Sequence, residues 1–371
     1  MERSTSGSRN GNGSARNGAS TRAEQNRSTT LLNSLGRFRG AYLVSHINPD
    51  PDSLGSMAGL AWLIRQRLNL PTQLTRDGIL GRAENRAMVE CLGLQLLPVE
   101  EVDWRPDWAL IMVDSQPGTG RHNVPETVPI LGVIDHHETP GQLRGVPIVD
   151  VRSDVGATCT IVASYLQEQG VTPSQEVATA LFYGIESEIN GYPREASPLD
   201  DETLVRLYPL VNKDLLACIR HARLPREYFE ALLQALQDTF IYDDRLIISW
   251  ADELPQPELA AEIADLLIRL EGMQWSVCAG VYEDRLIVSL RTAQARGQAG
   301  LVLQQVIGDL GTAGGHDRRA GGAIPLASAS TTAREKLQSQ LRRRFLQVLR
   351  IDECRGQRLV SRRELLENLQ A

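Results

Sequence analysis

Short aliphatic runs alternate with amphipathic stretches from about residue 36 onward. Three largely apolar runs predict buried strands, over residues 41–45, 108–113 and 129–134. Apolar positions at helical spacing predict helices over residues 53–70, 156–168 and 174–188. Strands that alternate with helices in this way indicate a parallel sheet covered on both faces.

The second half of the chain follows a different plan. A mostly helical stretch over 197–244 predicts a connector. Further strands are predicted over 245–250, 275–282 and 285–291, with helices over 257–271 and 300–310. The predicted fold class is therefore α/β, with a parallel-sheet domain joined by a helical connector to a smaller α/β C-terminal domain.

The two ends differ from the body of the chain. Residues 1–30 are almost wholly Ser, Gly, Asn, Thr, Arg and Ala, and such a segment buries too little apolar surface to order itself. Residues 331–371 have a helical and basic pattern. We therefore expect a disordered arm over 1–30, domains over 31–196 and 245–330 with the connector between them, and a helical tail over 331–371.

The composition of the 371 residues is globular, with 42% hydrophobic and 23% charged residues. A net charge of -7 disfavours non-specific binding to long nucleic acid but leaves open a short anionic ligand. No uncharged apolar run approaches the ~18 residues of a membrane span, and no apolar segment typical of a secretory signal is seen. The 5 cysteines are scattered and never in C-x-x-C pairs, which predicts free thiols in a cytoplasmic protein.

Polar residues follow three of the predicted strands at the point where each strand ends. In chain order they are His46, Asp50 and Asp52, then Asp114, then Asp135, His136 and His137. Ligands of open α/β sheets bind outside the carboxyl ends of the strands. An isolated Asp after a strand is usually a cap or turn residue, but three such loops together predict a functional site.

The first of these loops is rigid, because prolines at positions 49 and 51 fix its backbone. A rigid turn can direct several side chains toward one volume. Imidazole and carboxylate ligands without a nearby cysteine suit hard to borderline divalent ions. We therefore expect Mn²⁺, with Mg²⁺ or Co²⁺ as alternative ions.

These motifs resemble those of the DHH-family phosphoesterases, which are named for an Asp-His-His sequence. The segment from His46 to Asp52 resembles the first family motif, Asp114 the second, and residues 135–137 the third. The Gly-rich segment over 314–322, which we expect to be a loop, resembles the signature of the DHH-associated C-terminal domain. The resemblance covers about residues 36–326, and the subgroup that is most similar is that of the nanoRNases and pAp-phosphatases.

The chain departs from the family at the fourth motif, where Glu188 stands at the position of the usual Asp. A longer carboxylate can still bind a metal if the backbone withdraws by about a bond length. Glu186 is an alternative ligand, and a solvated carboxylate at the helix end is the interpretation without a function. The departure affects the affinity for the metal or the choice of ion.

The resemblance implies two metal ions in each chain. One ion would be held by His46, Asp50 and Asp114. The other would be held by Asp52, Asp114, His136 and Glu188, so that Asp114 bridges the two. Asp135 would orient a ligating imidazole, and His137 would face the substrate as a phosphate donor or proton source.

The resemblance also implies contacts to the substrate from the second domain. Glycines allow backbone N–H groups to approach a phosphate. Gly314 and Gly315 would act in this way. His316 and Arg291 would contact the terminal phosphate or the nucleotide, and Arg291 could bind a phosphate with two hydrogen bonds. Two domains on either side of a cleft favour a short substrate.

The predicted function is hydrolysis of short oligonucleotides or 3′-phosphoadenosine 5′-phosphate by metal-activated water. Asp114, Asp135 and His137 are the predicted catalytic residues. Hydrolysis of pyrophosphate, polyphosphate or a linear or cyclic dinucleotide is an alternative, and so is a nucleotide sensor with a decayed site. No membrane and no long nucleic acid are expected as partners, and a homodimer is left open.

Overall fold

The computed structural model describes residues 27–138, 141–189, 196–315, 317–326, 330–352 and 355–360. The chain divides into two compact units, one from the N-terminus to Ala222 and one from Arg223 onward, with the short segment Gly81–Ala83 clustering with the second. The division falls inside the stretch 197–244 that the sequence predicts as a connector. Its helices belong to one unit or the other: those up to Arg220 pack on helices of the first unit, and the helix Arg226–Gln237 packs on the sheet of the second.

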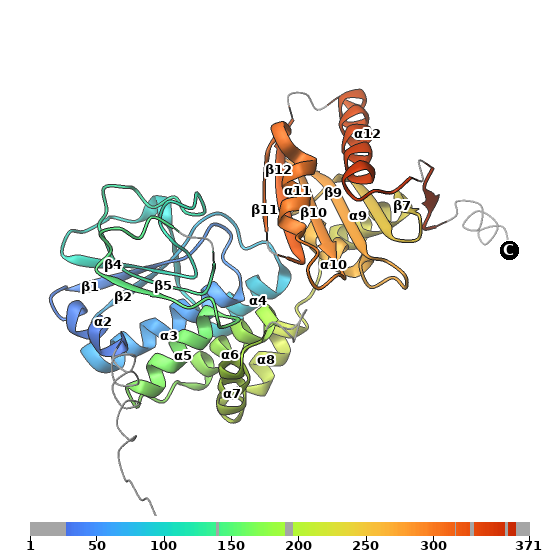
Figure 1. Ribbon diagram of the computed structural model, residues 1–371. Coiled ribbons are helices and arrows are strands. Elements are labelled where there is room, and N and C mark those ends of the chain that lie inside the picture. Colours follow the sequence, from blue (N-terminus) through green and yellow to red (C-terminus); the bar gives the residue numbers. More distant parts are fainter. Residues whose placement is uncertain are drawn as a thin grey trace, which may run out of the picture. The chain divides into compact units, whose positions relative to one another are not determined.

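The first unit is built on a six-stranded parallel sheet with the order β3-β2-β1-β4-β5-β6 (Figure 1). Its strands are β1 (Gly40–Val44), β2 (Thr72–Arg76), β3 (Leu96–Pro98), β4 (Trp108–Val113), β5 (Ile130–Asp135) and β6 (Ile148–Val151). The predicted parallel sheet is confirmed, and the three predicted strands are the central ones. Because the order reverses between β1 and β4, a crevice for ligands is expected where their carboxyl ends diverge.

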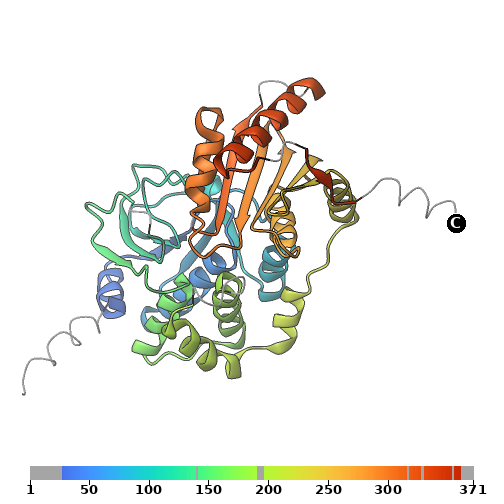
Figure 2. The same ribbon diagram turned by 45° about the vertical axis from the view of Figure 1, so that its right-hand side comes forward.

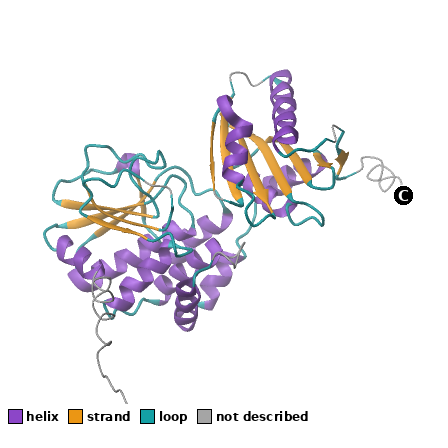
Figure 3. Ribbon diagram, in the orientation of Figure 1, coloured by secondary structure: helices purple, strands orange, loops and turns teal. Residues whose placement is uncertain are grey.

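Helices cover one face of this sheet, as Figures 1 and 3 show, whereas the other face, which the sequence pattern also predicted to be covered, is covered by loops and not by α-helices in the described part of the chain. The helices are α2 (Arg27–Leu35), α3 (Pro51–Leu68), α4 (Ala83–Leu92), α5 (Thr158–Glu168), α6 (Gln175–Ile189), α7 (Pro198–Leu207) and α8 (Lys213–Arg220). Side chains alternate across β1, so that Leu43 packs against these helices and Tyr42 against the loops on the other face. Residues 27–30 of the expected arm belong instead to α2, because Leu31 and Leu35 anchor this helix in the core; residues 1–26 lie outside the described part.

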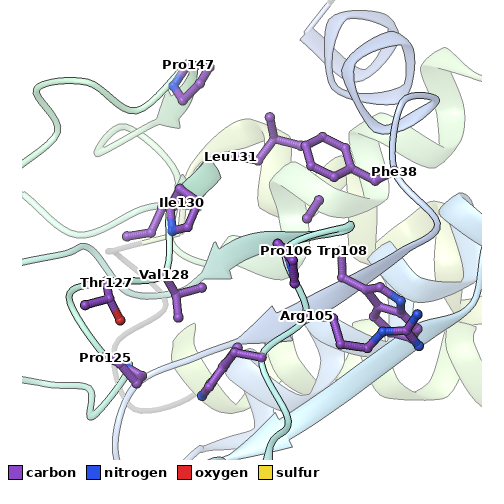
Figure 4. A pocket seen from close by; sticks show the side chains of 13 residues that line it. Phe38, Arg105, Pro106, Trp108, Pro125, Thr127, Val128, Ile130, Leu131 and Pro147 are labelled. Carbon is purple, nitrogen blue, oxygen red and sulfur yellow. The ribbon is translucent and has the colours of Figure 1, made fainter.

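The amino ends of the strands border an apolar pocket of about 400 Å³ (Figure 4). Trp108 at the start of β4, Ile130 at the start of β5 and Pro147 just before β6 contribute to its walls. This pocket therefore lies at the opposite edge of the sheet from the polar residues that follow the strands.

The second unit contains a mixed seven-stranded sheet with the order β11-β12-β10-β9-β8-β7-β13. Its strands are β7 (Thr239–Tyr242), β8 (Leu246–Glu253), β9 (Trp275–Tyr282), β10 (Arg285–Thr292), β11 (Thr312–Gly315), β12 (Arg319–Pro325) and β13 (Gln357–Arg358). Helices α9 (Arg226–Gln237) and α10 (Leu259–Leu267) pack on one face, and α11 (Ala299–Ile307) and α12 (Thr331–Val348) on the other (Figure 2). The predicted second α/β domain is confirmed.

Two expectations about the second unit need correction. The stretch 331–371 was expected to be a tail, but Leu341 and Phe345 of α12 are fully buried in the core of this unit. The Gly-rich segment was expected to be a loop, but its glycines lie in β11 and β12, where Gly314 pairs with Gly321. Glycine is needed there because a Cβ on Gly315 would lie 2.3 Å from the carbonyl oxygen of Arg319.

The cysteines do not all remain free thiols. Cys91 of α4 and Cys218 of α8 form a disulfide, whereas Cys159 and Cys278 are free and buried. Cysteine spacing could not reveal the first pair, because 127 residues separate its members along the chain. Every helix in the described ranges is too short or too polar to cross a membrane.

Candidate metal centre

The polar residues that follow β1, β4 and β5 lie side by side, because these three strands are neighbours in the sheet. Asp114 follows β4, the middle strand of the three, and its backbone has a φ of 55°. A non-glycine residue in this left-handed region is uncommon and is often found at functional sites. The conformation places the Asp114 side chain, which is only 1% exposed, between the loops of the two neighbouring strands.

Each carboxylate oxygen of Asp114 faces a different loop. Oδ2 lies 3.4 Å from Nε2 of His46, and Oδ1 lies 3.5 Å from Nε2 of His136. Two hydroxyls fix this carboxylate: Ser53 donates to Oδ2 over 2.7 Å, and Thr158 to Oδ1 over 3.1 Å. Asp114 is therefore oriented to take part in two adjacent ligand groups.

The loop after β1 carries two candidate ligands, His46 and Asp50, and leads directly into α3. Asp50 caps α3, because its side chain accepts a hydrogen bond from the backbone N–H of Ser53 over 3.0 Å. The other carboxylate oxygen of Asp50 lies 3.5 Å from Nε2 of His46. Nδ1 of that imidazole lies 2.8 Å from the carbonyl oxygen of Ile47, which leaves Nε2 directed at the two carboxylates.

Asp52 lies deeper, in the first turn of α3. Its two carboxylate oxygens accept hydrogen bonds of 2.7 Å from the backbone N–H groups of Thr158 and Cys159, at the start of α5. One of these oxygens also lies 3.9 Å from Nε2 of His136. Asp52 therefore ties the N-terminus of α5 to the site while it faces His136.

The third motif divides its residues between two tasks. The Asp135 side chain is 1% exposed, and its Oδ1 accepts a hydrogen bond from the backbone N–H of His136 over 2.8 Å. The same oxygen lies 2.8 Å from Nδ1 of His137. Asp135 thus contacts the two histidine residues and holds the ring of the second.

Two groups of side chains in the described part of the chain have the composition and proximity of a metal site. One comprises His46, Asp50 and Asp114, and the other comprises Asp114, His136 and His137, with ligand atoms within 4.8 Å of one another in each. Oxygen and nitrogen donors without thiolate suit Mn²⁺ and similar ions. The residues present therefore fit a pair of divalent cations that share Asp114.

The charged groups of this cluster shift one another's pKa values in opposite directions. Burial opposes ionisation of His46, but hydrogen bonds to Asp114 and Asp50 outweigh this effect and raise its pKa well above the usual value. Burial also opposes ionisation of Asp114, yet the neighbouring histidines lower its pKa. Burial and the negative charges of Asp114 and Asp50 raise the pKa of Asp52 well above the usual value. Such opposed pKa shifts are typical of functional sites.

Glu188 lies on α6, one helical turn after Gly184. At Gly184 the helix touches the start of α3, since a Cβ there would lie 3.3 Å from Cα of Asp52. Residues four apart share a helix face, so Glu188 follows on the face of α6 that touches α3, but neither candidate group of ligands in the described residues includes it. Glu186, the alternative ligand, instead forms an ion pair with Arg220 of α8.

The predicted substrate residues lie in the second unit. Arg291 ends β10 with only 5% of its surface exposed, and it is paired with Asp265 of α10. Its Nη1 donates to Oγ of Ser289 over 2.8 Å. Gly314 and Gly315 lie in β11, as described above, and His316 lies outside the described residues.

Sequence reasoning missed three residues that contact the site: Ser53, Thr158 and Gln116. The hydroxyl of Ser53 donates a hydrogen bond to Asp114. Its position directly after the first motif was a signal that could have been used. Thr158 is distant in sequence and no local pattern marks it, and Gln116 was overlooked although it follows Asp114 by two residues.

Comparisons with known proteins agree with this geometry. Residues 41–185 match the model of the DHH family, N-terminal domain. The uncharacterized protein MJ1633 of Methanocaldococcus jannaschii is 30% identical over 316 residues, which are 84% of this chain and 64% of that protein. A manganese-dependent inorganic pyrophosphatase of Methanothrix thermoacetophila is 30% identical over 152 residues, which are 40% of this chain and 46% of that enzyme.

The chain thus spans less than two thirds of the length of these curated relatives. Among solved structures, an exopolyphosphatase-related protein from Bacteroides fragilis has the same fold, with a TM-score of 0.67 and 14% identity over 88% of this chain and 98% of that one. All of the strand-end residues described above fall inside the matched family domain. This chain therefore carries a DHH family N-terminal domain in residues 41–185.

Proposed function

We propose that this protein is a phosphoesterase that uses two divalent cations, with Mn²⁺ the preferred ion, to hydrolyse short phosphorylated substrates. The observation that carries this proposal is Asp114, whose two oxygens face His46 and His136 at 3.4 and 3.5 Å. A carboxylate that serves two ligand groups at once is the arrangement that a pair of adjacent ions requires. The matched family domain and the similarity to a manganese-dependent pyrophosphatase support the same reaction class.

The ligands divide into two sets in this proposal. His46, Asp50 and Asp114 hold one ion, and Asp114 with His136, Asp52 and Glu188 holds the other. When bound, such a pair supplies positive charge to the phosphate oxygens and lowers the pKa of water. Ser53 and Thr158 hold the shared carboxylate in place by donating hydrogen bonds to it.

His137 belongs to the second candidate group, but its Nδ1, which lies 3.6 Å from Asp114, is held by Asp135 at 2.8 Å, so we assign this residue to the substrate. Asp135 holds its Nδ1, so Nε2 is the ring nitrogen on the side away from that carboxylate. From there, the imidazole can donate a hydrogen bond to a phosphate oxygen or deliver a proton to the leaving oxygen. Asp135 contributes by fixing the orientation and the tautomer of this ring.

We further propose that the second unit is a DHH-associated domain that binds one end of the substrate. Arg291 offers the charge, and Gly314 and Gly315 offer backbone approach. Short oligonucleotides and 3′-phosphoadenosine 5′-phosphate fit a site of this kind on a chain with a net charge of -7. Pyrophosphate is a second candidate, because the catalytic domain is 30% identical to a manganese-dependent pyrophosphatase.

The test is turnover of a substrate panel by the purified chain with Mn²⁺. The panel contains pAp, RNA of two to five nucleotides, a cyclic dinucleotide, pyrophosphate and polyphosphate. We expect one class to be hydrolysed, chelation to stop the reaction, and Asp114→Asn to lower kcat by at least about a thousandfold. Asp107→Asn, at the amino end of the same strand, is the matched control and should remain active. Activity that survives either chelation or Asp114→Asn would contradict the proposal.

A further inference from the structure

Gln116 is a buried amide in the loop after β4, two residues beyond Asp114, and it is only 2% exposed. Its Nε2 donates a hydrogen bond of 2.8 Å to Oδ2 of Asp135 and one of 3.1 Å to the carbonyl oxygen of His137. Its Oε1 accepts a hydrogen bond of 2.8 Å from the backbone N–H of Gly141. The two ends of one amide thus connect the loop after β4 to the loop after β5.

These contacts complete the hydrogen bonding of Asp135. Oδ1 serves the backbone of His136 and the ring of His137, both over 2.8 Å, and Oδ2 serves Gln116. A carboxylate that is bonded on both oxygens cannot rotate about its last bond without losing a contact. Its plane, and with it the direction of the His137 ring, is therefore set by Gln116.

The loop after β5 packs closely against Gln116 at Gly141. A Cβ on Gly141 would lie 2.5 Å from Cβ of Gln116 and 2.7 Å from the carbonyl oxygen of Pro117. Backbone and side chain therefore meet at a distance that only glycine allows. The close approach keeps the Gly141 N–H within reach of the amide and makes the contact specific to this position.

We infer that Gln116 is a positioning residue for the reaction, acting through Asp135 to aim His137 at the substrate; this inference rests on the proposed function. The two candidate metal groups do not include Gln116 or Asp135. Loss of Gln116 should therefore impair the chemical step without a matching loss of metal affinity. Residues that orient a functional side chain in this way typically contribute about 10–100-fold to activity.

Each single substitution, Gln116→Glu or Asp135→Asn, should break the hydrogen bond between the two side chains, because a hydrogen bond needs one donor and one acceptor. In Gln116→Glu, a carboxylate oxygen would face the Asp135 carboxylate, so two acceptors would meet. In Asp135→Asn, the new amide must keep its oxygen toward His136 and His137, so its NH₂ group would face the NH₂ group of Gln116. In the double variant, the asparagine NH₂ would donate to the glutamate, and the hydrogen bond would be restored with its direction reversed.

The experiment is this pair of single variants and their combination, assayed with Mn²⁺ and the best substrate of the panel. We expect Gln116→Glu to lower kcat by about 10–100-fold with little change in KM or in Mn²⁺ affinity measured by calorimetry. The kcat of the double variant should be at least about tenfold higher than that of the less active single variant. Recovery stays incomplete, because the glutamate would still face the carbonyl oxygen of His137. Gln142→Glu adds the same charge from an exposed side chain in the loop after β5, the loop that Gln116 contacts, and should leave kcat unchanged.

If the two residues had a purely structural role, their losses in kcat would add in the double variant. A double variant that is no more active than the less active single variant would therefore overturn the inference. Equal losses of Mn²⁺ affinity and kcat in Gln116→Glu would also overturn it, since the residue would then act on the ions. If the wild-type chain turns over nothing, the proposed function fails, but the Nδ1–H signal of His137 in ¹⁵N-histidine NMR still decides the positioning role. We expect this signal in the wild type and the double variant and a shifted or absent signal in Gln116→Glu; an unchanged signal there would overturn the inference.

Discussion

Gly184→Ala tests how tightly the helical layer holds the metal centre. The added Cβ would lie 2.5 Å from Sγ of Cys159, 2.9 Å from the carbonyl oxygen of Pro51 and 3.3 Å from Cα of Asp52. Two of these three atoms belong to the backbone that carries the first ligand loop. An ordinary contact requires about 3.4 Å, so the start of α3 must withdraw by about 0.5 Å.

The expected change in stability is small, because two effects oppose each other. Overpacking of a well-packed interior costs about 1–3 kcal/mol, whereas alanine in place of glycine within a helix contributes about 1 kcal/mol. The net loss in the free energy of unfolding is therefore about 0–2 kcal/mol. The displacement of the ligand loop has a larger consequence, and we expect Mn²⁺ affinity to fall by about 10–100-fold.

Gly59→Ala is the matched control for this prediction. Gly59 lies on α3, and its Cβ would meet the ends of the Leu181 and Val162 side chains at 2.8 and 2.9 Å. These methyl groups can rotate away, so the ligand loop is not displaced. Urea unfolding and calorimetry with Mn²⁺ measure the two quantities. Wild-type Mn²⁺ affinity in Gly184→Ala, or an equal loss in Gly59→Ala, would refute the reasoning.

Three further predictions concern other parts of the chain. Asp150→Asn should lower the free energy of unfolding by about 3 kcal/mol. Burial opposes ionisation of Asp150, but Arg152 and Tyr165 lower its pKa. The contribution of Asp150 to stability is therefore full above about pH 4 and is lost as the pH falls through the lowered pKa, which urea unfolding at a series of pH values measures. Glu188→Asp should keep Mn²⁺ affinity within about threefold while Glu188→Ala loses at least about tenfold, and equal affinities by calorimetry would remove Glu188 from the site. Arg291→Ala should raise the substrate's KM by about tenfold without changing Mn²⁺ affinity, and loss of bound metal would contradict its assignment to the substrate.

The sequence was most informative where burial and local chemistry coincide. The runs at β1, β4 and β5 are apolar on both faces, so pattern alone placed them to within a residue or two. The short strands β2 and β3, of which β3 is at the edge of the sheet, were not predicted, because they are only partly buried. Strand β12 was read as a loop, since glycine is unfavourable in strands unless another backbone approaches closely.

The residues of the candidate site also differ in how well the sequence predicts them. Residues His46 to Asp52, Asp114 and the third motif follow strands directly, so the topology of a parallel sheet brings them together. The hydroxyl of Thr158 reaches Asp114 only because α5 packs beside α3, and the pairing of Arg291 with Asp265 depends on how α10 lies on its sheet. Contacts of this second kind arise from tertiary packing, which no local pattern encodes.

The assembly of the ligands from separate strands has a thermodynamic consequence. His46, Asp114 and His136 are far apart along the chain and meet only in the folded sheet, so an unfolded chain offers no comparable site. Any cation that the folded chain binds must therefore shift the folding equilibrium, by about 2.7 kcal/mol for one site at a free concentration 100 times its dissociation constant. The concentration of free metal around this protein would then regulate how much of it is folded as well as how fast it works.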